Sequence, residues 1–188
     1  MRIGAAAAAL LAFVACGGKD ANQVNGSYGG QSIDVADGLL LPPQRDLFGG
    51  VVSVVVLESA SDVCSLMQTG VINDTRLITI GLGIETEKGL LAPASEIGTY
   101  LIGGPAFLPS GTKLAGLRFG LVDTCGRNST ADAVSGTVQI TSVAPNLSGT
   151  VAYMDGTFQA VFDNGESLSG AFHVSMCTGA RLAFGRCR

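Results

Sequence analysis

The sequence is poor in the residues on which many enzymes and nucleic-acid-binding proteins depend. It contains no tryptophan and a single histidine, His173, and only 14% of its 188 residues are charged. The three lysines, Lys19, Lys88 and Lys113, are far apart, so no basic cluster is present that could neutralise a phosphate backbone. Acidic residues outnumber basic residues by fifteen to eleven. We therefore expect no nucleic-acid partner.

The sequence also lacks an apolar run long enough to cross a membrane, although 47% of its residues are hydrophobic. A membrane-spanning helix needs about 20 apolar residues, whereas the one candidate run covers residues 3–15. This run follows Arg2 and ends in the small residues Val14 and Ala15, which is the order found in a signal peptide. We expect residues 1–15 to be removed, which leaves a mature chain with a formal charge of −5.

Cys16 directly follows this segment. The run Phe13-Val14-Ala15-Cys16 resembles the lipobox of bacterial lipoproteins, with Phe13 at the position that is usually leucine. The resemblance implies that Cys16 is acylated and begins the mature protein, which would then be anchored in the bacterial cell envelope. Gly17 rather than aspartate follows the cysteine, so the expected location is the outer membrane. Over its whole length the chain is similar in kind to small lipoproteins of myxobacteria, and this likeness implies no activity.

The rest of the chain predicts one all-β domain. Residues 16–25 have no apolar periodicity and predict a lipidated flexible tether, and residues 26–188 are long enough for a single core. Many of the 27 glycines lie between short apolar runs, which is typical of short strands joined by tight turns. We predict strands at residues 27–35, 50–58, 76–85, 98–102, 113–123 and 136–143, followed by a meander over residues 148–177.

Turn and capping residues give the finer predictions. Asp155-Gly156 and Asn164-Gly165 each predict a tight hairpin turn, and "DNGE" at residues 163–166 fits a turn better than a calcium loop. Residues 59–70 predict a helix of about two turns that begins after Ser61 and ends at Gly70. The expected fold is an antiparallel β-sandwich or flattened barrel with one short helix. Strand 50–58 carries apolar residues on both of its faces, so we expect both faces to be covered.

Four cysteines remain after Cys16: Cys64, Cys125, Cys177 and Cys187. They contain no Cys-x-x-Cys pair, so we expect no metal site and read them as two disulfides of an exported chain. We favour Cys64–Cys125 with Cys177–Cys187, because the second bridge would fix the C-terminal tail. A Cys64–Cys177 bridge stays open as the alternative.

No known catalytic motif is present, so we assign no catalytic residue and no cofactor. The sequence has no Gly-x-Ser-x-Gly elbow, phosphate-binding loop or His-Glu-x-x-His pair. His173 is expected to be a surface or partly buried histidine. The irregular segment at residues 93–109, with Tyr100 and Phe107, is the candidate for an exposed binding loop.

We expect a non-enzymatic binding or structural module that contacts other envelope proteins or surface glycans. The alternative is a small periplasmic or surface hydrolase, or an inhibitor of one, that acts through a loop site without a recognisable motif. A deep pocket that grouped His173 with a carboxylate and a hydroxyl would favour the hydrolase.

Overall fold

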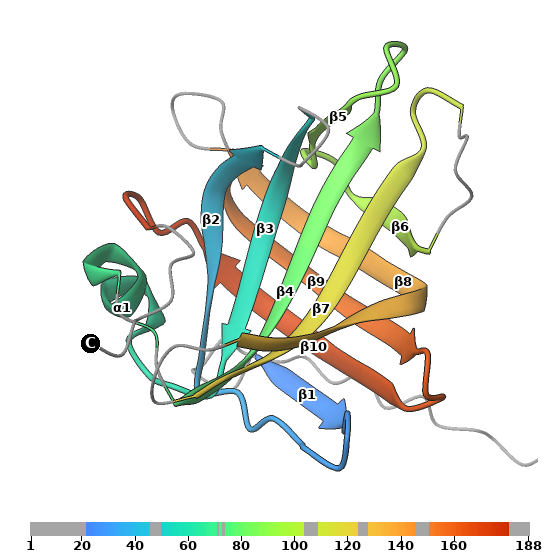
Figure 1. Ribbon diagram of the computed structural model, residues 1–188. Coiled ribbons are helices and arrows are strands. Elements are labelled where there is room, and N and C mark those ends of the chain that lie inside the picture. Colours follow the sequence, from blue (N-terminus) through green and yellow to red (C-terminus); the bar gives the residue numbers. More distant parts are fainter. Residues whose placement is uncertain are drawn as a thin grey trace, which may run out of the picture.

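The structure is a computed structural model that describes residues 22–45, 50–70, 72, 74–103, 109–123, 128–145 and 151–180 (Figure 1). Its strands form one ten-stranded sheet in the order β1-β10-β9-β8-β6-β7-β4-β3-β2, with β5 paired to β4. The elements are β1 (Gln23–Gly26), β2 (Asp37–Arg45), β3 (Val51–Glu58), α1 (Val63–Thr69), β4 (Thr75–Glu85), β5 (Leu91–Pro93), β6 (Gly98–Ile102), β7 (Lys113–Val122), β8 (Asn128–Pro145), β9 (Val151–Phe162) and β10 (Ser167–Ser175).

The sheet curls into two layers because β8 belongs to both. Its first residues pair with β7, whereas its later residues pair with β6 and β9, and the register shifts between Ala133 and Ser135 and between Ile140 and Ser142. Such irregularities bend a strand. As a result β2, β3, β4 and β7 face β8, β9 and β10 (Figure 1).

The two layers approach each other again where β10 ends beside β2. The backbone N–H of Cys177 donates to the Leu40 carbonyl oxygen at 2.9 Å, and Leu40 and Met176 form an isolated parallel bridge. The sheet is nevertheless not closed, because β1 and β2 remain its edges. The predicted all-β class with one short helix is confirmed, but the sheet is mixed rather than wholly antiparallel, since β6 and β7 run parallel.

Two apolar cores lie on opposite faces of β3, as the apolar residues at both parities of this strand predicted. Val55 and Val56 are both fully buried: Val55 lies in the core between the layers, and Val56 in a smaller core beneath α1. The larger core contains all of the buried aromatic side chains of the described residues, namely Tyr100, Phe119, Phe158, Phe162 and Phe172. The smaller core includes Leu39, Leu77 and the helix residues Val63 and Met67.

Helix α1 ends as predicted but begins differently. Gly70 ends it in the left-handed conformation, with φ of 74°. Its N-cap position is Asp62 rather than Ser61, and the Asp62 side chain makes no capping hydrogen bond. Instead, the Asp37 carboxylate on β2 accepts the Val63 N–H at 3.0 Å. A distant residue therefore supplies the cap, which local sequence could not indicate.

The favoured disulfide pairing was wrong. Cys64 of α1 is bonded to Cys177, with a Cα–Cα distance of 5.6 Å, so neither Cys64–Cys125 nor Cys177–Cys187 forms. The pairing follows from the curl of the sheet, which brings the end of β10 beside β2, where α1 is packed. Cys125 and Cys187 lie outside the described residues.

Two predictions for the N-terminal part were also wrong. Residues 23–26, most of which were assigned to the tether, form β1 and pair with β10, whereas residues 27–35 form no strand. Gly29 and Gly30 both have positive φ and make a tight turn between Tyr28 and Gln31. The sequence signal for β2 was obscured by Pro42-Pro43, which this edge strand accommodates at a register shift.

Of the two predicted hairpin turns, one is present. Asn164-Gly165 lies in the β9–β10 connection, where Gly165 has φ of 82° and its N–H donates to the Phe162 carbonyl. The Phe162 N–H donates to the Glu166 carbonyl at 2.9 Å, so this pair closes a loop of three residues rather than two, which is another common hairpin form. Asp155-Gly156 is not a turn, because β9 runs straight through it.

Gly156 is instead required by packing between β9 and β10. It lies directly opposite Phe172, and Gly170 lies directly opposite Phe158, so that each ring stands over a glycine of the neighbouring strand. Aromatic side chains can cover strand glycines in this way. The two pairs therefore contribute to the core between the layers.

We expect Gly156→Ala to lower the free energy of unfolding by about 2 kcal/mol, because an added Cβ would lie 2.6 Å from the Phe172 ring and 2.7 Å from the Gln139 carbonyl oxygen. Denaturant unfolding measures the change. Gly116→Ala is the matched control, since a Cβ on this strand glycine meets nothing within 4 Å. The control should leave stability unchanged or raise it slightly. Equal losses in both variants would contradict the packing account.

Candidate functional site

Outward-facing side chains of four neighbouring strands form a continuous polar surface. On β9, Thr157 and Gln159 are exposed while their neighbours Phe158 and Ala160 are buried, as expected for alternating strand positions. The register places these residues in two rows that cross β1, β10, β9 and β8. We call the eight residues of these rows the polar face: Asn25, Ser169, Gln159 and Thr137 in one row, and Gln23, Ala171, Thr157 and Gln139 in the other.

The polar face is hollowed, with a volume of about 490 Å³. The hollow forms because β10 contributes the short side chains of Ser169 and Ala171, while the strands on either side carry longer amides. Its lining consists of the polar face together with Phe158 and Gly170. Among the residues that the structure describes, no ionisable side chain belongs to this lining.

Several side chains of the polar face are available to a ligand. Gln139 accepts a hydrogen bond from the Thr99 hydroxyl on β6 and donates to its neighbouring backbone at 3.4 Å. Within the described part of the chain, five others make no side-chain hydrogen bond. These five are Asn25, Thr137, Thr157, Gln159 and Ser169.

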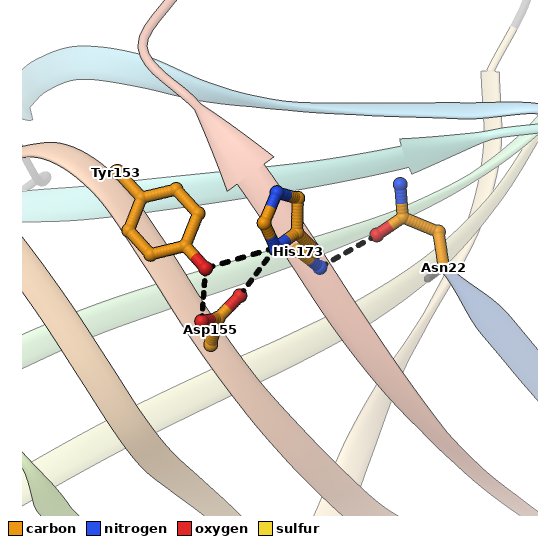
Figure 2. Close-up of polar contacts among 4 residues, drawn as sticks. All are labelled: Asn22, Tyr153, Asp155 and His173. Carbon is orange, nitrogen blue, oxygen red and sulfur yellow. Dashed lines mark hydrogen bonds and ion pairs between the residues drawn. The ribbon is translucent and has the colours of Figure 1, made fainter. Parts of the chain in front are cut away.

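The next cross-strand pair beyond the polar face carries an imidazole and a carboxylate. His173 on β10 lies opposite Asp155 on β9, and its Nδ1 is 2.8 Å from Asp155 Oδ1 (Figure 2). The Tyr153 hydroxyl contacts His173 Nδ1 at 2.9 Å and is hydrogen-bonded to Asp155 Oδ2. The His173 backbone N–H donates to the Asn22 side-chain oxygen at 2.8 Å. This cluster thus ties β9, β10 and the start of β1 together.

The protons in this cluster can be placed from its electrostatics. Partial burial, and then the adjoining Asp155 carboxylate, raise the pKa of Tyr153 to about 12. The phenol therefore keeps its proton and donates it to Asp155, which leaves its oxygen as an acceptor. Since both neighbours of His173 Nδ1 then accept, Nδ1 carries a proton. The second ring nitrogen points away from Tyr153 and Asp155 (Figure 2).

The arrangement orients an imidazole, as an aspartate does in catalytic triads, but it lacks the other parts of a hydrolytic site. The His173 side chain is 47% exposed on the outside of the sheet and does not line the hollow. Its only side-chain partners within the described residues are Asp155 and Tyr153, and neither is a serine or cysteine nucleophile. His173 is thus grouped with a carboxylate and a hydroxyl, but on an open surface rather than in a deep pocket.

Sequence reasoning placed His173 correctly on a strand surface but missed its partners. Tyr153, Asp155, Thr157 and Gln159 alternate with buried residues along β9. This alternation was present in the sequence, but taking Asp155-Gly156 as a turn interrupted it. The residues of β1 were missed because residues 16–25 were assigned to the tether.

The segment at residues 93–109 does not present Tyr100 to a ligand. Tyr100 is fully buried in β6, and its hydroxyl donates to the Glu96 carbonyl at 2.9 Å. The pKa of Tyr100 is raised to about 12, mainly because the side chain is buried. Phe107 lies outside the described residues. The prediction of an exposed aromatic loop is therefore wrong for Tyr100.

A second, smaller pocket of about 320 Å³ has a different chemistry. It lies between strands β2, β3 and β5 on one side and the start of β9 and the end of β10 on the other. Leu40, Pro43, Ala94, Val151 and Met176 are among its lining residues, and the only hydroxyls that the described residues contribute are those of Ser53 and Ser95. Ser53 already donates to the Ala94 carbonyl at 3.2 Å, so this pocket offers little polar recognition.

Among the described residues, no group of three or more histidine, cysteine, aspartate or glutamate side chains is placed to hold a metal ion. The part of the chain that the structure describes also contains no helix long and apolar enough to cross a membrane. Of the predicted site residues, Cys64 and Cys177 are brought together, whereas Cys16 lies outside the described residues, as Cys125 and Cys187 do.

Comparison with known proteins adds no identity: no protein-family model, no curated protein and no solved structure matches the chain.

Proposed function

We propose that the chain is an exported, lipid-anchored protein of the bacterial cell envelope that acts as a non-enzymatic binding module. The signal-like segment and the lipobox-like run ending at Cys16 support export and anchoring. The hollowed polar face supports binding, and it is the observation that carries the proposal. Its five uncommitted amide and hydroxyl side chains form a surface that can bind by hydrogen bonding without any reactive group.

A small hydrolase is the second candidate, and the His173–Asp155 pair is the observation that favours it. It ranks below the binding module because the pair is exposed and lies outside the lining of the hollow. A general base must also lie within reach of the proton that it removes from a positioned substrate or nucleophile. The contacts of His173 within the described residues provide neither.

For the anchor, we expect protein purified from membranes to have the mass of a chain that begins at Cys16 with added acyl groups. Two or more acyl chains hold a protein stably on a membrane, whereas one does not. Cys16→Ser should therefore move the protein from the membrane fraction to the soluble extracytoplasmic fraction. A mature chain that starts at Cys16 without acyl mass would refute the anchor.

For binding, we expect the full-length protein carrying Cys16→Ser to sediment with purified cell-envelope material. Adding Thr157→Lys should reduce the bound fraction at least tenfold, because a long charged side chain would fill the hollow and block its amide and hydroxyl groups. The measurement is the bound fraction after centrifugation over a range of envelope concentrations.

Thr130→Lys is the matched control for Thr157→Lys. Thr130 is also an exposed strand threonine, but it lies on the part of β8 that pairs with β7 and does not line the hollow. This control should bind like the parent protein. Unchanged binding by Thr157→Lys, or equal loss in both variants, would show that the polar face is not the binding surface.

A further inference from the structure

The described residues that line the hollow of the polar face are all uncharged, which suits the recognition of a neutral ligand. Within the part of the chain that the structure describes, no lysine, arginine, aspartate, glutamate or histidine lines its hollow. The ionisable pair Asp155 and His173 is one cross-strand position away, and the two side chains interact with each other. An acidic or basic polymer would find no opposite charge among the described lining residues, so charge complementarity favours an uncharged ligand.

The hydrogen-bonding groups of the hollow match a ligand rich in hydroxyls. A side-chain amide has both donors and an acceptor, and a threonine or serine hydroxyl can do either. Asn25, Gln159 and Thr157 therefore can each bond to a ligand hydroxyl in whichever direction it is oriented. Charged side chains lack this freedom, because a lysine only donates and a carboxylate only accepts.

The spacing of these groups suits an extended ligand. Neighbouring strands lie about 4.8 Å apart, so a row that crosses four strands extends about 14 Å. Asn25 and Thr137 stand at the two ends of one row, with Ser169 and Gln159 between them. Polar groups thus recur at each strand across the hollow, while the short side chains of β10 leave room for a ligand.

The composition of the hollow is unlike that of a protein-binding surface. The cores of protein interfaces are enriched in exposed aromatic residues, methionine and arginine. Phe158 is the only such residue among the described lining residues, and it is only 2% exposed. The exposed apolar side chains Leu101 and Val161 lie beside the hollow but do not line it. A polypeptide would therefore find few apolar contacts.

We propose that the polar face binds a neutral glycan, whose hydroxyls bond to the amides and hydroxyls of the two rows. This inference rests on the proposed function, because it names the ligand class of the same surface. The Tyr153 and His173 rings, whose centroids are 4.6 Å apart, lie outside this lining on the same two strands, β9 and β10.

An oligosaccharide array tests the inference directly. Full-length protein carrying Cys16→Ser is applied to an array that holds neutral gluco-, galacto-, manno- and N-acetylglucosamine oligosaccharides beside uronate- and sulfate-bearing ones. Binding should be confined to neutral members and should not change between low and high salt, because no ion pair is involved. Binding only to acidic members, or to none, would overturn the proposal.

Substitutions then locate the site, and they distinguish a wrong ligand class from a wrong binding surface. The double variant Asn25→Ala/Gln159→Ala should weaken binding of the neutral glycan at least tenfold, because each lost hydrogen bond reduces affinity about fivefold. Thr130→Ala should have no effect. If the array shows no neutral glycan but Thr157→Lys still abolishes envelope binding, the ligand class is wrong and the surface is right. If Thr157→Lys leaves envelope binding unchanged, the proposed function itself fails.

Discussion

Replacing Cys64 and Cys177 together by alanine is expected to lower the free energy of unfolding by about 4 kcal/mol. The bridge closes a loop with a sequence separation of 113 residues, so its removal greatly increases the freedom of the unfolded chain. It also joins α1 to the end of β10, where the two layers of the sheet meet without closing. The loss should therefore include local opening of this contact.

Guanidinium unfolding of oxidised protein, reduced protein and the double variant measures this effect. Reduced protein and the variant should have similar midpoints, both well below that of the oxidised protein. A variant as stable as the oxidised protein would contradict the assigned role of the bridge. Peptide mapping without reductant should find Cys64 joined to Cys177, and detection of a Cys64–Cys125 peptide would contradict the structure directly.

Glu58 provides the second large effect, because its carboxylate is buried beside a second carboxylate. The residue is fully buried at the end of β3, and neither carboxylate oxygen has a hydrogen-bond partner of good geometry among the described residues. Its cross-strand neighbour Asp37 carries a second carboxylate. Together these surroundings raise the pKa of Glu58 to about 7, with burial as the largest cause. The Thr75 hydroxyl opposes the increase in pKa, and the negative charge of Asp37 adds to it.

We expect this residue to make the protein less stable as pH rises from about 4.5 to about 7. Over that range the folded state retains a proton that the unfolded state has released, so the free energy of unfolding falls with pH. Below about 4.5 both states are protonated and the penalty is absent. Above about 7 the full penalty applies, about 3 kcal/mol for a shift of this size.

Glu58→Gln should remove this pH dependence and raise the free energy of unfolding at pH above 7 by about 3 kcal/mol. The measurement is the difference between the variant and the parent protein across the pH range, because other groups titrate equally in both. Glu87→Gln, at an exposed turn, is the control and should follow the parent protein at every pH. A difference for Glu58→Gln that does not vary with pH would contradict the account.

Features of the fold that depend on local sequence could be predicted. Strand 98–102 was predicted with its observed bounds, the strand at 50–58 was placed correctly and covered on both faces, and Gly70 ends α1. The errors arose where distant contacts decide the outcome. Asp155-Gly156 has turn composition, but Phe172 on the next strand requires glycine there. The disulfide likewise depends on the curl of the sheet, which no local pattern encodes.

The candidate site could be predicted only in part for the same reason. The position of His173 on a strand surface followed from alternation. The polar face could not be assembled, because it requires the order of β1, β10, β9 and β8 in the sheet. Gln23 and Asn25 are separated from Gln159 by more than a hundred residues in sequence, and pairing of β1 with β10 places them beside one hollow.

The most direct test of the central claim is to observe which surface a bound ligand contacts. Nuclear magnetic resonance spectra of the isotope-labelled protein carrying Cys16→Ser would be recorded with and without soluble envelope polysaccharide. We predict that the side-chain amide signals of Asn25 and Gln159 shift, together with backbone signals of β9 and β10. Unchanged signals on these strands, with shifts confined to β3, β4 or α1, would contradict the claim that the polar face is the binding surface.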